Sequence, residues 1–148
     1  MISRAGKITE TWFDTLTEHG GLSRFRPLYF VIEGGLLAIA IAFWFSAYFD
    51  QGSSFSPETW GELACQYPAQ MWAFLTMAGA TLTIIGLLHP QVWWVVALGA
   101  VIQVLQFSAL GYSAAFTGGQ FVIMIYEAGF FVPIHMLILT GALRHGRD

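Results

Sequence analysis

Residues 27–49 of the chain read PLYFVIEGGLLAIAIAFWFSAYF, and this stretch decides the class of fold. Its only charged side chain is Glu33. A helix needs about 20 mostly apolar residues to cross a lipid bilayer, and this stretch meets that length. Pro27 suits the first turn of such a helix, because the N–H group that proline lacks is not needed there. The stretch therefore predicts a transmembrane helix.

Three further apolar segments of similar length follow, at 67–88, 91–112 and 120–143. Over all 148 residues, 56% are hydrophobic and 10% are charged. A soluble domain normally carries about a quarter charged residues, so most of this surface is expected to face lipid. The sequence predicts an all-α membrane protein with four transmembrane helices at 27–143, joined by a turn at 89–91, a loop at 50–66 and a glycine-bearing link before residue 120.

The basic residues indicate how the helices are oriented. All of them lie outside the four apolar segments: Arg4, Lys7, Arg24, Arg26, Arg144 and Arg147. The 50–66 loop has acidic residues and no basic one. Positive side chains collect on the cytoplasmic side, so both termini, including the short basic tail 144–148, are expected in the cytoplasm, with the bacterial inner membrane as the expected location. Aromatic residues near the segment ends fit interfacial belts: Tyr29, Tyr48, Trp60, Trp72, Trp93, Trp94 and Tyr112.

Residues 1–26 predict a cytoplasmic amphipathic helix followed by a basic linker. Apolar side chains recur at helical spacing there: Ile8, Trp12, Phe13 and Leu16. The opposite face is acidic, and a helix that lies on anionic lipid usually has a basic polar face. Two placements stay open, one on the membrane surface and one against the bundle or a partner protein.

Ionisable residues inside a bilayer are costly, so they are candidates for function. The apolar segments contain three: Glu33, Glu127 and His135. At about 1.5 Å per helical residue, Glu33 and His135 both lie roughly 10 Å from the cytoplasmic side, so they could pair if the first and fourth helices are neighbours. Glu127 is expected nearer the other side, with Gln106 and, one turn deeper, Gln103. The sequence thus predicts two polar layers.

These layers have two interpretations. They could form a proton or ion path, or line a polar lumen in an oligomer. They could instead be hydrogen bonds that hold helices together, each worth about 1 kcal/mol or less in a membrane. Pro133 has no N–H group to donate to the carbonyl of Gly129, so the helix is expected to kink there. The freed carbonyl adds a further polar group under both interpretations.

The first segment also carries a ridge of small residues every four positions: Gly34, Ala38, Ala42 and Ser46. Small side chains let two helices approach closely. The ridge predicts a tight helix contact, either within the chain or between copies.

Several kinds of site are not expected. The one cysteine, Cys65, cannot form a disulfide within the chain, and it is either a plain small residue or half of a disulfide between chains. No motif indicates a metal, a cofactor or a nucleophile, and the basic residues are too dispersed for nucleic acid. A haem between His89 and His135 is disfavoured, because His89 stands in a turn. The sequence therefore predicts no enzyme.

The function that these features favour is helix packing by a non-enzymatic four-span protein, in an oligomer or with other membrane subunits. One alternative is a holin-like pore, or another phage-associated membrane protein. The other is a small proton-coupled transporter that uses Glu33 and Glu127.

Overall fold

The computed structural model of the chain describes residues 25–49 and 56–145, and these ranges form helices and turns without a β-strand. Four helices in them are long and apolar enough to cross a membrane. They are α3 (Arg26–Phe49), α6 (Ala69–Leu88), α7 (Trp93–Phe116) and a fourth built from α8 (Phe121–Met124), a π-helix η2 (Ile125–Phe131) and α9 (Val132–His145). The expected all-helical fold with four membrane-length helices is confirmed. The amphipathic helix expected within 1–26 lies outside the described residues.

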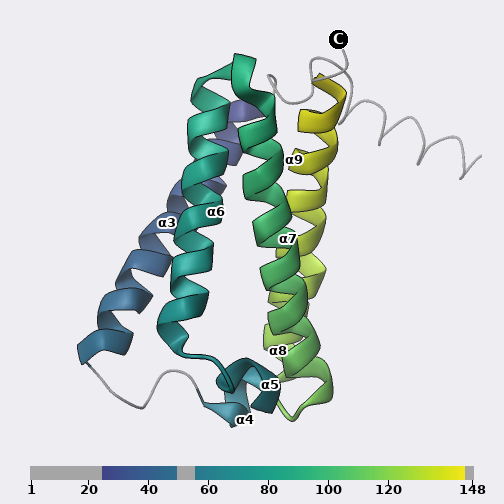
Figure 1. Cartoon of the computed structure of the whole chain (residues 1–148). Coiled ribbons are helices and arrows are strands. Elements are labelled where there is room, and N and C mark those ends of the chain that lie inside the picture. Colours follow the sequence, from purple (N-terminus) through teal and green to yellow (C-terminus); the bar gives the residue numbers. More distant parts are fainter. Residues whose placement is uncertain (1–24, 50–55, 146–148) are drawn as a thin grey trace, which may run out of the picture.

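The helices pack in chain order. Helix α3 packs on α6, α6 on α7, and α7 on both η2 and α9. The beginning of α3 and the end of α9 lie at one end of the bundle, here called the terminal end (Figure 1). The opposite end, called the loop end, carries α4 (Pro57–Trp60) and α5 (Glu62–Cys65). The positions of the loops follow from this antiparallel arrangement.

The third membrane helix extends past the expected end at residue 112. A 3₁₀ turn, η1 (Pro90–Val92), leads into α7, which continues to Phe116 because the segment 112–116 holds no glycine or proline. The helix stops at Thr117, and the next residue, Gly118, has a positive φ of 94°, which glycine adopts without strain.

The described part of the 50–66 loop is a helical cap rather than an irregular loop. The backbone N–H of Ala64 donates to Ser113 Oγ at 2.8 Å, and that of Glu62 donates to the carbonyl of Thr117 at 3.0 Å. Gly61 has a φ of 85°, and a Cβ there would lie 2.2 Å from the carbonyl oxygen of Ser113. The cap is therefore fastened to the end of α7 so closely that Gly61 has no room for a side chain.

Two apolar clusters form the core. The one at the terminal end consists of Tyr29, Leu87, Val96, Ala97, Ala100, Ile138 and Ala142. The one toward the loop end consists of Leu36, Ala64, Trp72, Ala80, Phe107 and Leu110. Tyr29 and Trp72 are thus buried, whereas Trp94 and Tyr112 are exposed. The interfacial belt expected from the sequence is wrong for Tyr29 and Trp72, because both side chains turn into the bundle.

Close helix contacts inside the chain come from glycines of α6 and α7. A Cβ on Gly86 would lie 2.4 Å from Val96 Cγ2, and one on Gly99 would lie 2.7 Å from the carbonyl oxygen of Gly79. A Cβ on Gly34, in contrast, would meet nothing within 4 Å. The other three residues of the small-residue ridge are exposed on α3: Ala38, Ala42 and Ser46. The contact that this ridge predicts is not made within the described chain, and a contact between chains stays a prediction.

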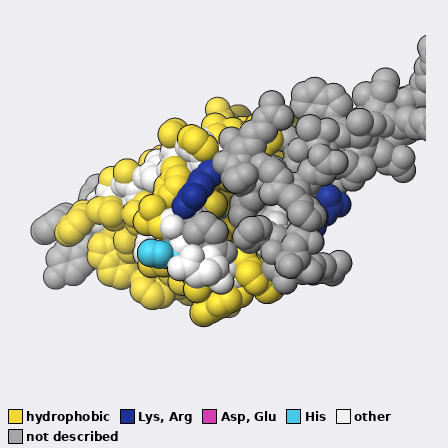
Figure 2. Space-filling model, turned by 90° about the horizontal axis from the view of Figure 1, so that it is seen from above, with side chains coloured by type: hydrophobic (Ala, Val, Ile, Leu, Met, Phe, Trp, Pro, Cys, Tyr) yellow, Lys and Arg dark blue, Asp and Glu magenta, His cyan; other side chains and the backbone are white. Residues whose placement is uncertain are grey.

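The outer surface of the bundle is apolar. Figure 2 shows the terminal end, where hydrophobic side chains cover most of the described surface and a few basic and histidine side chains lie among them. Large apolar side chains are exposed along the helices, for example Val31 at 73% and Leu105 at 65%. Such a surface suits contact with lipid tails. It leaves the interior as the place for polar side chains.

Candidate functional site

Each of the four long helices places one fully buried polar side chain between the two apolar clusters. On every helix this residue stands between residues that pack in the terminal-end cluster and residues that pack in or against the other cluster. We call the four the central polar layer: Glu33, Thr83, Gln103 and His135, each 0% exposed. The sequence identified three of them.

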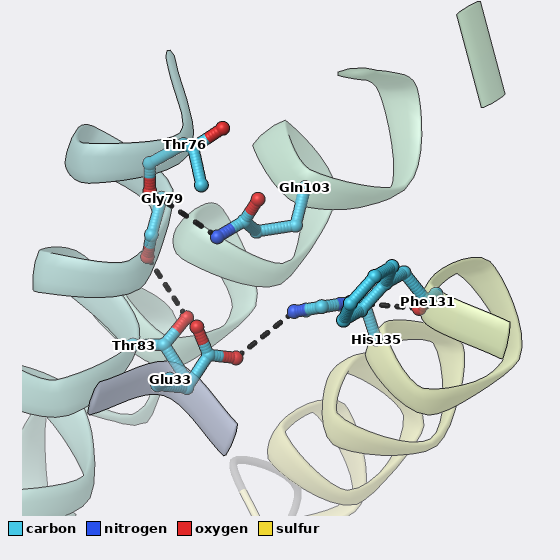
Figure 3. A network of polar contacts seen from close by, with 7 residues as sticks. All are labelled: Glu33, Thr76, Gly79, Thr83, Gln103, Phe131 and His135. Atoms are coloured by element: carbon cyan, nitrogen blue, oxygen red, sulfur yellow. Dashed lines mark hydrogen bonds and ion pairs between the residues drawn. The ribbon is translucent and has the colours of Figure 1, made fainter. Parts of the chain in front are cut away.

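Glu33 and His135 are joined directly, as the depth estimate predicts. Glu33 Oε1 lies 3.0 Å from His135 Nε2, and the two side chains point toward one another from α3 and α9 (Figure 3). The other ring nitrogen, Nδ1, lies 2.7 Å from the carbonyl oxygen of Phe131. This pair is a polar link between α3 and α9.

The contact with Phe131 fixes the tautomer of the histidine. A carbonyl oxygen only accepts hydrogen bonds, so Nδ1 must carry a hydrogen. The Nε2 contact then has two forms. Either a neutral Glu33 carboxyl donates its proton to Nε2, or a charged imidazolium donates from Nε2 to the carboxylate. Both forms place one hydrogen between His135 Nε2 and Glu33 Oε1.

The other two members of the layer bond to α6. Thr83 Oγ1 donates to the carbonyl of Gly79 at 3.0 Å, and Gln103 Nε2 donates to the carbonyl of Thr76 at 3.3 Å (Figure 3). The sequence puts Gln103 one turn deeper than Glu127 and Gln106, and the structure groups it with Glu33, Thr83 and His135. Gln103 turns toward α6, where Gly79 leaves room for its side chain, since a Cβ there would lie 2.8 Å from Gln103 Cγ.

A second polar group lines a cavity of about 190 Å³ between α3, α6, α7 and η2. Gln106 and Glu127 both line this cavity, 4% and 8% exposed, in agreement with the expected second layer. Gln106 Nε2 donates to the carbonyl of Trp72 at 3.1 Å and to Thr76 Oγ1. We call Thr76, Gln106 and Glu127 the cavity layer.

Two phenylalanines connect the cavity with the Glu33–His135 pair. The rings of Phe107 and Phe131 are stacked at 4.8 Å between centroids, and both line the cavity. The same rings contact His135, at 5.4 Å and 6.5 Å between centroids. A movement of His135 would therefore shift two rings of the cavity wall.

The buried polar atoms left without a partner are all acceptors. In the described part of the chain they are Glu33 Oε2, Gln103 Oε1, Gln106 Oε1 and Glu127 Oε2. An unsatisfied buried acceptor costs about 1–3 kcal/mol. The interior thus offers oxygens and lacks donors, which is suited to holding protons or positively charged groups.

Glu127 lies in the π-helix η2. The N–H of Val132 donates to the carbonyl of Glu127, five residues earlier, and Pro133 follows at once. The sequence predicts a break near Pro133, and the structure gives a widened turn directly before it; the kink itself stays a prediction. Short π-helical stretches inside α-helices often occur at functional sites.

Sequence reasoning missed the threonines of α6 and the tryptophans of the cavity. Thr76 and Thr83 are seven residues apart, two helical turns, which would have placed them on one face with Gly79 and Ala80. Trp60 and Trp72 were assigned to interfaces. His89 is exposed in its turn, whereas both ring nitrogens of His135 have partners in the protein. Among the described residues no three His, Cys, Asp or Glu side chains gather as a metal site would require.

Comparisons with known protein families, with curated proteins and with solved structures find no match for this chain. The geometry of the bundle interior is therefore the basis for an inference about function.

Proposed function

We propose that the chain is a non-enzymatic, proton-coupled carrier of the bacterial inner membrane with both termini in the cytoplasm. One observation carries the proposal: Glu33 and His135 are fully buried, and Glu33 Oε1 lies 3.0 Å from His135 Nε2 in the middle of the bundle. Ionisable groups at such a depth in membrane proteins commonly belong to proton relays or substrate pathways. Binding and proton exchange require no bond to be made or broken in a substrate.

The contacts of His135 supply the coupling. Its Nδ1 donates to the carbonyl of Phe131, and the ring of Phe131 lines the cavity. A second proton on the pair, or the loss of the shared one, changes the bond between Glu33 and His135 and with it the position of the residues around Phe131. A ligand in the cavity and a proton on the pair would then influence one another, as linkage requires.

The charges of the described residues support the orientation. Arg26 and Arg144 lie at the two helix ends of the terminal end, and Glu58 and Glu62 lie in α4 and α5 at the loop end. Because basic residues are in excess on the cytoplasmic side of membrane proteins, these charges support a cytoplasmic terminal end.

The test uses purified protein in liposomes that enclose a pH-sensitive dye. Small apolar amines, alcohols and acids are added outside, one at a time. We expect at least one compound to change the internal pH in liposomes with the native chain and not in liposomes with Glu33→Gln. The proposal fails if no compound changes the internal pH in liposomes with the native chain, or if liposomes with the native chain and with Glu33→Gln respond alike.

A second function, assembly with copies of the chain or other membrane subunits, is favoured by the exposed ridge on α3. Ala38 and Ala42 face outward and would let another helix approach closely. Ala38→Leu should lower the yield of cross-linked oligomers more than Ile39→Leu, a change at a neighbouring exposed residue. Equal yields would exclude the ridge as the contact.

A holin-like pore is less well supported. A lumen between copies needs polar side chains on the outer surface of each copy, whereas Gln106 and Glu127 lie inside a single bundle. We expect cells that express the chain alone to keep their membrane potential. A sudden depolarisation after induction would favour the holin-like pore over the carrier.

A further inference from the structure

We propose that the cavity between α3, α6, α7 and η2 binds a small hydrophobic cation, an organic ammonium group attached to one apolar or aromatic group. This inference rests on the proposed carrier function and names the class of its substrate. It follows from three properties of the wall: its size, its hydrogen-bonding groups and its aromatic rings.

The size limits the ligand to about one ring and a small substituent. A protein cavity of about 150 Å³ lined by apolar side chains binds benzene, and this cavity measures about 190 Å³. Most of the lining is apolar, with Leu36, Ile39 and Ala40 from α3 and Leu110 from α7. A strongly hydrated ion or a sugar would lose its water there without enough polar partners in return.

The hydrogen-bonding groups of the wall exclude an anion. The donors of three residues that line it are occupied by the protein itself: Gln106 Nε2 and Thr76 Oγ1 both donate to the carbonyl of Trp72, and Trp72 Nε1 donates to the carbonyl of Ala64. The atoms that remain without a partner are acceptors, Gln106 Oε1 and Glu127 Oε2. A ligand that fits must bring a hydrogen-bond donor or a positive charge. The carboxyl group of Glu127 in the wall is the partner for that donor or charge.

The aromatic side chains favour a charge over a neutral donor. Five of the lining residues are aromatic: Phe43, Trp60, Trp72, Phe107 and Phe131. The face of an aromatic ring attracts a cation, and sites for quaternary ammonium groups are commonly built from several such rings. A carboxyl group among aromatic rings in an otherwise apolar cavity is thus the chemistry that recognises a hydrophobic cation.

The test compares three probes of similar shape in binding to the purified full chain in detergent. Phenyltrimethylammonium carries a positive charge, tert-butylbenzene is its neutral counterpart, and benzenesulfonate is an anion. We expect the cation to bind most tightly by isothermal titration calorimetry, and about tenfold more tightly than the neutral probe. Tighter binding of the neutral probe or of the anion, or no binding of the cation, would overturn the inference.

Variants locate the binding site. Glu127→Gln should weaken binding of the cation by about tenfold or more, whereas Glu58→Gln, at an exposed acid of the same end, should leave it unchanged. In case Glu127→Gln does not fold, Trp60→Leu and Trp60→Phe give a second comparison, in which the phenylalanine keeps the ring and should retain most of the affinity. Equal affinity in all these variants would place the cation elsewhere and contradict the assignment.

The result is separable from that of the carrier proposal. If a neutral compound or an acid, but no cation, changes the internal pH in liposomes with the native chain and not in those with Glu33→Gln, the carrier stands and the substrate class is wrong. If the cation binds at Glu127 and no compound moves protons, the binding site stands and the carrier function is wrong.

Discussion

The Nε2 atom of His135 lies 3.0 Å from Oε1 of Glu33, and this contact joins residues 102 positions apart in the chain. Both side chains are fully buried, one on the first membrane helix and one on the last. Because His135 is also bonded to the carbonyl of Phe131, both of its ring nitrogens have partners, and the pair connects α9 with α3. The predictions below test its energetics and the packing around it.

Removal of both partners should destabilise the protein by less than the sum of the two single removals. Glu33→Leu or His135→Leu leaves a buried polar group without its partner, and we expect each to lower the free energy of unfolding by about 2 kcal/mol. The double variant should fall short of the sum by about 1 kcal/mol. Unfolding in mixed micelles measures this, with Ile39→Leu as a control. Additive effects would show that the two residues do not interact.

The glycines of α6 and α7 should tolerate alanine less well than the glycine of the α3 ridge. Gly86→Ala places a methyl group against Val96 and should cost about 1–3 kcal/mol of stability. Gly34→Ala meets open space and should leave stability unchanged or raise it by about 0.5–1 kcal/mol, because alanine favours helix. Thermal unfolding measures the stability of the two variants. Equal stability of Gly86→Ala and Gly34→Ala would refute the close packing of α6 on α7.

The cap at the loop end should loosen when Ser113 is lost. Ser113 Oγ accepts the backbone N–H of Ala64, so Ser113→Ala leaves that buried donor unsatisfied. We expect hydrogen exchange at Ala64 to become about tenfold faster. Ser108→Ala, at an exposed position on the same helix, is the matched control. Unchanged exchange in Ser113→Ala would mean that the cap is held by other contacts.

The single cysteine should react as a partly buried thiol. Burial raises the pKa of the Cys65 thiol above its usual value. The thiolate is the reactive form, so alkylation of Cys65 by iodoacetamide should reach half of its maximal rate at a higher pH than alkylation of N-acetylcysteine. Mass spectrometry of the modified chain over a series of pH values gives the profile. A midpoint at or below that of N-acetylcysteine would contradict the burial.

The same cysteine reports the orientation. With the terminal end in the cytoplasm, a maleimide that cannot cross the membrane should label Cys65 in cells whose outer membrane has been opened. In a Cys65→Ser background, Leu88→Cys, at an exposed position of the terminal end, should be labelled only after the inner membrane is permeabilised. The reverse pattern would invert the proposed orientation.

Much of the fold follows from the sequence, because apolar length and the position of charges determine which segments can cross a bilayer. Counting residues along two antiparallel helices was enough to place Glu33 and His135 at one depth, and the structure shows that their helices are close enough for the two side chains to pair. The turn of Gln103 toward α6 was not accessible in this way, since it depends on the space left by Gly79. The cavity could not be predicted either, because tryptophan near the end of a segment is typical of a membrane interface. In the structure Trp60 and Trp72 line the cavity beside the cap of α4 and α5.

The widened turn of η2 lies between these cases. Pro133 gives a reason for a break in the fourth helix, but a missing N–H alone does not determine whether the chain bends, adds a residue to the turn or recruits a side chain. In this chain the turn before Pro133 is widened to a π-helix, and Glu127 within it lies in the cavity wall. Thr76 and Thr83 of α6 could have been found from their spacing. Thr83 belongs to the central polar layer and Thr76 to the cavity layer.

The central claim is that Glu33 and His135 take up and release a proton inside the bundle. Infrared difference spectra of the reconstituted chain, recorded as the pH is changed, report the protonation of buried carboxyl groups directly. We predict a carboxyl band in the native chain and in Glu127→Gln that is missing in Glu33→Gln and displaced in His135→Gln. Identical spectra for the native chain and Glu33→Gln would mean that the pair only holds the helices together, and would contradict the account.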